Sequence, residues 1–292
     1  MSAWKLSCAD YTFPAVDHRQ ALRIIADLGF DGVDLGFFAG RSHVRPENCL
    51  TDPAAAGERA ASAVREAGLV VADVFAQISD DFHVGSVNDP ADLTRAAALD
   101  ALMRCLDFAA STDAQGMTVL PGVHHEGEEW EASFSRSVDA LEVLVAAAEN
   151  RGLRLSVEPH VESLVATPVR ASALIAAVPG LTLTLDPAHF VFSGHTAAEV
   201  DGLLDSVRHV QLRGGAPGVL QASSSANVID FGGLVAKLEQ IGYDGWLATE
   251  YVWSPWHDCD RVDNLTETVL LRQSLLADSR GSGANSALGA RQ

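Results

Sequence analysis

Two hydrophobic periods alternate along this chain, one typical of β-strands and the other typical of amphipathic helices. In LTLTLDPAHF, at 181–190, three leucines occupy alternate positions, and two threonines and Asp186 occupy the positions between them. In the stretch 17–28, apolar residues recur three and four positions apart, which places them on one face of a helix. The same patterns predict strands at residues 4–9, 30–37, 69–75, 116–122, 153–160, 181–186, 207–215 and 245–253. They predict helices at residues 17–28, 54–67, 92–111, 133–150, 168–178, 197–204, 231–241 and 261–277.

The predicted strands and helices alternate eight times, and glycines mark helix ends. Strict alternation implies parallel strands joined by helical crossovers. Eight such units in 292 residues predict an α/β protein with the (β/α)8 TIM barrel fold, and the alternative is an open doubly wound sheet. We expect one barrel domain over residues 1–278 and a disordered tail over 279–292, where Gly, Ser and Ala dominate.

The composition narrows the classes of partner. The net charge is −19, which argues against nucleic acid, because phosphate contacts require a basic surface. No apolar stretch approaches the roughly 18 residues that a membrane span needs, and we expect no signal peptide at the start. The four cysteines are far apart in the chain, which indicates free thiols in a reducing compartment. We therefore expect a cytoplasmic protein that binds neither membrane nor nucleic acid.

Side-chain parity places polar residues on the inner side of the last four predicted strands. The helix-facing side of a barrel strand must be apolar, so the opposite positions point into the barrel. At the strand ends these inward residues are Glu158, Asp186, Gln211 and Glu250, with His209 one layer deeper as an expected core residue. Active sites of TIM barrels lie at the carboxyl ends of the strands, where we expect the four side chains to converge. The alternative is that they are unrelated helix caps and surface acids.

The charge of this set indicates a metal ion. Three carboxylates held close together repel one another and are costly to bury without a counter-charge. A divalent cation is the natural counter-charge, and an oxygen-rich set of ligands favours Mg²⁺ or Mn²⁺ over Zn²⁺.

Four motifs in the second half of the chain resemble the sugar phosphate isomerase/epimerase family, whose members are xylose-isomerase-like barrels. The motifs are SVEPH at 156–160, LDPAHF at 185–190, RHVQLRG at 208–214 and GYDGWLATEY at 242–251. The first half resembles the family only loosely, through LGFDGVDL at 28–35 and LPG at 120–122. Together the motifs are fairly specific for the superfamily, but they do not name a substrate.

The resemblance implies that Glu158, Asp186, the strand-seven residue and Glu250 bind one divalent ion, in the family often Mn²⁺, Mg²⁺ or Co²⁺. It also implies that His189, in the D-x-x-H motif, contacts the substrate or metal-bound water. Many members have histidine where this chain has Gln211. An amide oxygen is itself a competent ligand for a hard cation. Some relatives, including keto-inositol dehydratases and a class of dehydroshikimate dehydratases, resemble this chain in using glutamine there.

We therefore expect a metal-dependent isomerase or epimerase that acts on a sugar or keto-sugar through an enediolate. In the epimerases that this chain resembles, two glutamates handle protons on opposite faces, and here these are Glu158 and Glu250. The alternative, which Gln211 favours, is a metal-dependent dehydratase (a lyase) acting on a keto-inositol or a dehydroshikimate-like substrate. In either reaction, His189 is expected to protonate a leaving hydroxyl or to polarise the carbonyl.

Weaker candidates for substrate binding are Arg213, His124 and Trp253, which follow predicted strands. The expected partner is a small carbohydrate or a polyol-derived molecule. Homo-oligomers are common among the relatives, but the sequence leaves the oligomeric state open. An abasic-site endonuclease on a related barrel would need more histidine ligands and a basic face, and a non-catalytic binding barrel would require the convergence of acids to be accidental.

Overall fold

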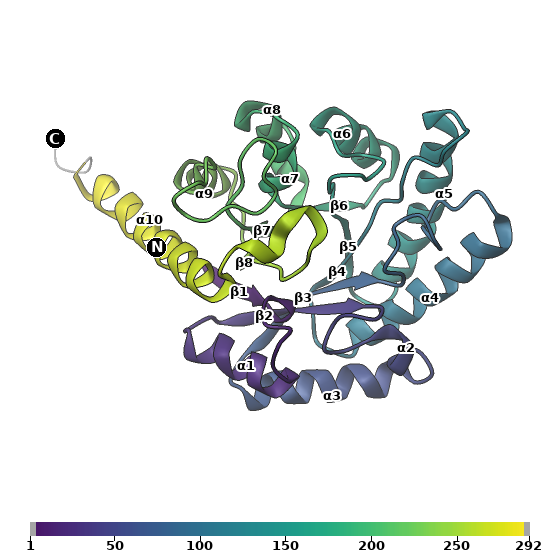
Figure 1. Cartoon of the computed structure of the whole chain (residues 1–292), viewed down its shortest axis with the longest axis horizontal. Coiled ribbons are helices and arrows are strands. Elements are labelled where there is room, and N and C mark those ends of the chain that lie inside the picture. The colour runs from purple at the N-terminus through teal and green to yellow at the C-terminus, as the bar shows by residue number, and fades with distance from the viewer. Residues whose placement is uncertain (1–3, 289–292) are drawn as a thin grey trace.

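The computed structural model describes residues 4–288, and it confirms the predicted TIM barrel. Eight parallel strands close into a barrel in sequence order, with β1 paired to β8, and the helices lie around them (Figure 1). The strands are β1 (Lys5–Ala9), β2 (Gly32–Phe38), β3 (Val70–Gln77), β4 (Gly116–Val119), β5 (Arg154–Val157), β6 (Thr182–Leu185), β7 (Val207–Leu212) and β8 (Trp246–Thr249).

Each predicted helical range overlaps an α-helix, but α8 ends earlier than predicted and α10 extends well beyond its predicted end. Two further short helices are additions that the sequence pattern does not predict. The α-helices are α1 (His18–Asp27), α2 (Pro46–Cys49), α3 (Pro53–Glu66), α4 (Asp92–Ala110), α5 (Trp130–Glu149), α6 (Pro168–Ala177), α7 (Pro187–Phe192), α8 (Ala197–Asp201), α9 (Phe231–Gln240) and α10 (Asn264–Leu288). Three 3-10 helices are η1 (Asp10–Thr12), η2 (Leu204–Ser206) and η3 (Trp256–Arg261). The additions, α2 and α7, have only four and six residues, too few to show a helical period, and both begin with proline.

The carboxyl-terminal helix overlaps the expected tail. α10 extends away from the barrel and is described as far as Leu288, so the tail expected over 279–292 begins inside this helix (Figure 1). Residues 289–292 lie outside the described part of the chain, and the domain boundaries stay predictions.

Helix starts are set by side chains that accept hydrogen bonds from the free backbone N–H groups of the first turn. Asp17 accepts a 3.0 Å hydrogen bond from the backbone N–H of Gln20, and the Gln20 side chain accepts one of 3.2 Å in return. This capping box fixes the start of α1. Thr167 and Asp230 cap α6 and α9 in the same way, with one bond each.

Polar pairs fill part of the barrel interior beneath the strand ends. His209 on β7 and Asp34 on β2 are fully buried, with Nε2 and Oδ2 2.6 Å apart, and Asp34 also accepts a 2.8 Å hydrogen bond from the Ser7 hydroxyl. Arg208 and Asp73 form a second ion pair at 2.8 Å. The expectation that His209 is an inward core residue is therefore confirmed.

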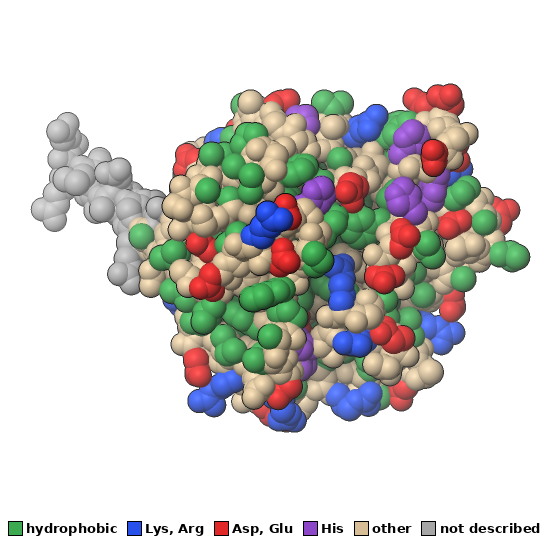
Figure 2. Space-filling view, in the orientation of Figure 1, with side chains coloured by type: hydrophobic (Ala, Val, Ile, Leu, Met, Phe, Trp, Pro, Cys, Tyr) green, Lys and Arg blue, Asp and Glu red, His purple; other side chains and the backbone are tan. Residues whose placement is uncertain are grey.

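The surface and the helices bear on the expected partners. On the face in Figure 2, acidic and basic side chains are interspersed, and this face shows no continuous basic patch. None of the helices within residues 4–288 has the length and apolar character needed to cross a membrane. All four cysteines are buried free thiols, as expected. The cytoplasmic location and the absence of a nucleic-acid partner stay predictions.

Candidate functional site

The four polar residues predicted to converge lie at the carboxyl-terminal ends of β5 to β8. Glu158, Asp186 and Glu250 each follow the last residue of a strand directly, and Gln211 is the last but one residue of β7. None of the four exposes more than 4% of its surface. The backbone N–H groups of the two glutamates bond to the neighbouring strands, at 3.2 Å and 2.9 Å, which fixes where each carboxylate begins.

Asp186 caps a helix and contributes to the site at the same time. Its Oδ1 accepts a 2.8 Å hydrogen bond from the backbone N–H of Ala188 and so caps α7. Its Oδ2 has no hydrogen-bond partner among the described residues. The capping role that one acidic strand end suggests is therefore present, and it leaves one carboxylate oxygen for the site.

Each of the four converging side chains has one buried oxygen without a hydrogen-bond partner in the described part of the chain. These atoms are Glu158 Oε1, Asp186 Oδ2, Gln211 Oε1 and Glu250 Oε2. A buried acceptor without a partner costs about 1–3 kcal/mol, and more when it is charged. Carboxylate and amide oxygens suit Mg²⁺ or Mn²⁺, so the ends of these consecutive strands offer candidate ligands for a cation.

His189 lies beside two of these carboxylates. Glu158, Asp186 and His189 each offer one candidate ligand atom, and these atoms lie within 4.8 Å of one another. The backbone N–H of Val161 donates a 3.1 Å hydrogen bond to His189 Nδ1, so this nitrogen is unprotonated. Burial lowers the pKa of His189 to about 3, and the neutral ring therefore carries its proton on Nε2. In this tautomer, His189 presents a hydrogen-bond donor rather than a metal-binding lone pair.

Arg213 places its guanidinium among the acids. Its Nη2 lies 2.7 Å from Asp186 Oδ2, 3.6 Å from Glu250 Oε2 and 2.8 Å from His189 Nε2. Burial opposes the charge of Arg213, but the carboxylates outweigh it and raise the pKa, so the guanidinium stays protonated. Arginine only donates, so His189 Nε2 could accept from Arg213 only in the tautomer protonated on Nδ1, which conflicts with the Val161 bond. With the proton on Nε2, both side chains present donors, and an acceptor atom of a ligand beside the pair would satisfy both.

Tyr11, in η1 directly after β1, joins two of the predicted ligands. Its hydroxyl donates a 2.6 Å hydrogen bond to Glu250 Oε1 and accepts one of 3.2 Å from Gln211 Nε2. Burial raises the pKa of Glu250 to about 8, opposed by Arg213 and by the Tyr11 bond and reinforced by Glu158. Nothing in the sequence around Tyr11 distinguishes it from a core aromatic residue, so the sequence pattern does not reveal this role.

A cavity of about 280 Å³ opens onto these groups. Glu158, His189, Arg213 and Glu250 line one part of it. Its other walls are largely aromatic and contain Phe38, Phe75, Phe82, Trp253 and Trp256. A concave, mostly apolar cavity with a few polar groups at one end is typical of a small-molecule site.

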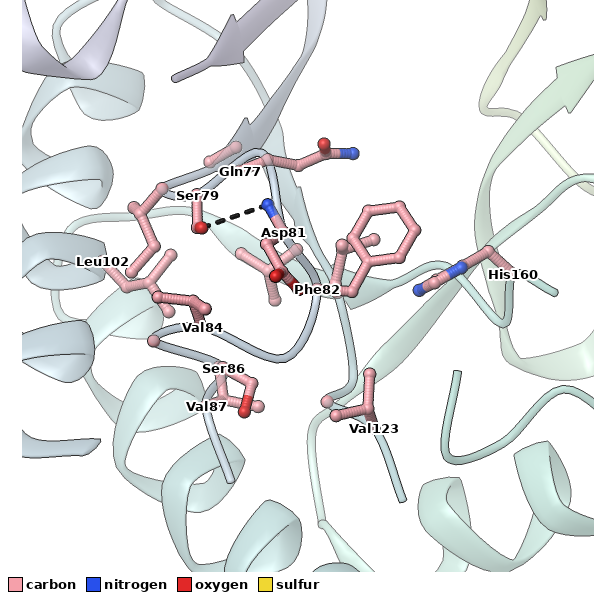
Figure 3. Close-up of a pocket in the computed structure, with 16 residues that line it drawn as sticks. Gln77, Ser79, Asp81, Phe82, Val84, Ser86, Val87, Leu102, Val123 and His160 are labelled. Atoms are coloured by element: carbon pink, nitrogen blue, oxygen red, sulfur yellow. Dashed lines mark hydrogen bonds between the residues drawn. The ribbon is translucent and has the colours of Figure 1, made fainter. Parts of the chain in front are cut away.

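His160 is a second residue that the sequence pattern leaves without a role. Its side chain lines the cavity and is 1% exposed, yet neither ring nitrogen has a hydrogen-bond partner among the described residues. Burial lowers its pKa to about 4, so the ring is neutral. Figure 3 shows His160 beside Phe82, whose ring centroid is 4.8 Å away, at the edge of a smaller cavity of about 40 Å³. A buried imidazole with two free nitrogens is available to a ligand.

The three predicted substrate-binding residues have different outcomes. Arg213 lies inside the site, and Trp253 lines the cavity at its outer edge with 60% of its surface exposed. His124 is not brought to the cavity, which corrects the expectation for it. The loop after β4 turns its side chain to solvent, where His124 Nε2 lies 2.9 Å from the Glu128 carbonyl oxygen. Trp256, in the same segment as Trp253, also lines the cavity, and its ring centroid is 6.1 Å from that of His189.

Comparison with known proteins gives one family match and many similar folds. The family described as the xylose isomerase-like TIM barrel matches residues 22–273. An L-ribulose 3-epimerase is 16% identical, with a TM-score of 0.76 over 100% of this chain and 99% of that chain. A 3-keto-D-glucoside 4-epimerase from E. coli is 17% identical and has a TM-score of 0.70, with a match that covers 92% of this chain and 99% of that chain. A xylose isomerase-like TIM barrel protein from Mycobacterium smegmatis, in complex with magnesium, is 16% identical and has a TM-score of 0.70. Its match covers 95% of this chain and 98% of that chain. No curated protein matches this sequence.

Proposed function

The chain belongs to the xylose isomerase-like TIM barrel family. From this premise we propose that it is a divalent-metal-dependent isomerase or epimerase that acts on a sugar or keto-sugar. The reaction begins when a carboxylate removes the proton next to the substrate carbonyl, which gives an enediolate. Support comes from the fold shared with sugar epimerases and from the chemistry of the strand ends.

The observation that carries the proposal is the set of four buried oxygens without a hydrogen-bond partner among the described residues. Two of them, Asp186 Oδ2 and Glu250 Oε2, lie 2.7 Å and 3.6 Å from the Arg213 guanidinium, which offsets part of their charge. Glu158, Asp186, Gln211 and Glu250 hold the metal ion in this proposal. When bound, the ion polarises a substrate carbonyl and an adjacent hydroxyl as a Lewis acid. Mn²⁺ and Mg²⁺ suit this set of oxygen donors, and Co²⁺ is the further option that the family resemblance suggests.

Two glutamates of the cavity carry out the proton transfers in this proposal. Glu158 and Glu250 approach from β5 and β8, which are separated in the barrel by β6 and β7, and so they face a bound substrate from different sides. One glutamate removes the α-proton. Return of a proton by the other glutamate to the opposite face gives epimerisation, and return to the neighbouring carbon gives isomerisation. The donors on His189 and Arg213 stabilise the negative charge that develops on the substrate oxygen.

Gln211 supports a second candidate function, a metal-dependent dehydratase on a keto-inositol or a dehydroshikimate-like substrate. The chain resembles such dehydratases at this position, and Gln211 Oε1 is buried and unpaired, as a ligand atom would be. The first proton abstraction is the same. The two functions diverge when a β-hydroxyl leaves, with His189 Nε2–H in a position to protonate it.

The test combines metal analysis with proton exchange. The purified chain is expected to contain about one divalent ion and to exchange the α-proton of a ketose for deuterium in D2O, with loss of both properties on chelation. Formation of an unsaturated product that absorbs in the ultraviolet would identify the dehydratase instead. A chain that holds no divalent ion, and whose activity no added ion stimulates, contradicts both functions.

A further inference from the structure

The cavity wall away from the metal-binding residues has few hydrogen-bonding groups. Aromatic and other apolar side chains make up most of it, and the polar lining residues there are Arg41, Gln77, His160 and Ser254. A sugar carries hydroxyls along its whole length, and each hydroxyl buried without a partner costs about 1–3 kcal/mol. The few polar groups of this wall are therefore the places where it can recognise a polar group of the substrate away from the metal-binding residues.

Arg41 is the charged group on this part of the wall. It follows β2, and its guanidinium lies over the Phe38 ring, 4.7 Å from the centroid. It also donates a hydrogen bond to Gln77 Oε1 at the end of β3. This leaves the Gln77 amide N–H groups available for another acceptor. Stacking on one side chain and bonding to another hold the exposed guanidinium of Arg41 at the cavity.

Arg41 has no acidic partner of its own within the described chain, although the chain contains 39 Asp and Glu residues. Arg213, the other arginine in the cavity, lies 2.7 Å from Asp186 Oδ2. Among the described residues, no carboxylate oxygen lies within 4.0 Å of the Arg41 guanidinium nitrogens. Glu250, Asp80 and Glu158 act on its charge only from farther away. A free guanidinium beside an amide donor offers parallel N–H groups, which is the geometry that binds a carboxylate.

The charges of the site point to the same ligand. The charged residues that line the cavity are Glu158, Glu250, Arg213 and Arg41. Arg213 lies 2.7 Å from Asp186 Oδ2 and 3.6 Å from Glu250 Oε2, whereas Arg41 forms no ion pair among the described residues. Arg41 is therefore the lining cation whose charge is left for a negatively charged group of a ligand.

We infer that Arg41 and Gln77 bind a carboxylate of the substrate, so that the substrate is a keto acid with its carbonyl at the metal-binding residues and its carboxylate at the end of β2. This inference rests on the proposed function, because it takes the carbonyl end from there. A single guanidinium with one amide matches a monoanionic carboxylate. A phosphate group would need further donors, and the lining residues contain no lysine.

The test compares two probes that differ only in charge, 3-oxocyclohexane-1-carboxylate and 3-oxocyclohexane-1-carboxamide. Binding of each to the metal-loaded full chain is measured by calorimetry for the wild type, Arg41→Gln and Arg45→Gln. Arg45 is the control because it is also exposed and loses the same charge, but it bonds to the Ser42 carbonyl and does not line the cavity. We expect the wild type and Arg45→Gln to bind the carboxylate probe at least about tenfold more tightly than the carboxamide probe. For Arg41→Gln, we expect the dissociation constants of the two probes to agree within about twofold.

The outcomes separate the two proposals. Three results would overturn the carboxylate site. The wild type could bind the two probes equally, it could bind neither probe, or the preference for the carboxylate could persist in Arg41→Gln. Displacement of the carboxylate by an equal concentration of inorganic phosphate overturns it as well, in favour of a phosphate. Metal content and α-proton exchange are measured on the same preparation. A chain that holds metal and exchanges protons without preferring the carboxylate keeps the proposed function, whereas a chain without metal loses it whatever Arg41 does.

Discussion

The hydroxyl of Tyr11 donates a 2.6 Å hydrogen bond to Glu250 Oε1, and so joins the end of the first strand to the end of the last. The two residues are 239 positions apart in the chain, and they meet because β1 pairs with β8 to close the barrel. The bond holds one oxygen of Glu250 and leaves the other, Oε2, without a hydrogen-bond partner among the described residues. Barrel closure therefore sets the position of a carboxylate to which we assign proton transfer.

Tyr11→Phe is expected to lower kcat by about tenfold, because one hydrogen bond that positions Glu250 is lost. KM and metal content are expected to change little, since Oε2 and the other three ligands remain. The phenyl ring keeps its edge-on packing against Phe38, with centroids 4.8 Å apart, so the melting temperature serves as the control for folding. An unchanged kcat would show that Glu250 does not depend on this bond.

Glu158→Gln and Glu250→Gln are each expected to reduce turnover by about 10²–10⁴-fold, because an amide cannot accept the substrate proton. Both substitutions keep the size of the side chain. Glu66→Gln makes the same chemical change in an exposed ion pair with Arg19 and should leave kcat unaltered. If Glu250→Gln kept full activity, the assignment of the site would be wrong.

Gln211→Leu is expected to weaken metal binding by at least about tenfold, because the amide oxygen that completes the ligand set is removed. Gln211→His should retain the metal, since many members of the family that this chain resembles have histidine at this position. Metal content after dialysis against a fixed concentration of Mn²⁺ measures both variants. Full occupancy in Gln211→Leu would exclude Gln211 as a ligand.

His160→Phe is expected to raise KM by about tenfold, because the two free ring nitrogens of this buried side chain are lost to the substrate. Phenylalanine keeps the aromatic contact with Phe82, so a purely packing role predicts no change in KM. The exposed His124 provides the matched control, and His124→Phe should leave KM unaltered.

Asp34→Ala is expected to lower the free energy of unfolding by about 3 kcal/mol, measured by denaturant titration. The substitution leaves His209 Nε2 and the Ser7 hydroxyl without their shared acceptor in the barrel interior. Asp27→Ala removes a carboxylate from an exposed pair with Arg23 and should cost less than about 1 kcal/mol. Equal effects of the two substitutions would mean that the buried pair contributes no more than the surface pair.

The sequence by itself determined the fold and the inward positions of the last four strands. A strand alternates its side chains with a period of two, so an apolar row at 181, 183 and 185 is enough to place Asp186 on the inner side. The same local rule placed Glu158, Gln211 and Glu250, and all four are buried at neighbouring strand ends. Alternation of strands and helices was equally local, which is why the order of the barrel followed from the sequence pattern.

Only the tertiary structure decided which other residues meet these four. Tyr11, Arg41 and His160 lie in segments that follow β1, β2 and β5, and their distances from the ligands depend on the closure of all eight strands. Loops have no period, so the sequence could not show that His124 faces solvent while Trp256 faces the cavity. The tautomer of His189 likewise depends on a backbone N–H from another segment, that of Val161. The local pattern therefore fixed the directions of side chains on strands, and the packing of distant segments fixed the neighbours that give those side chains their chemistry.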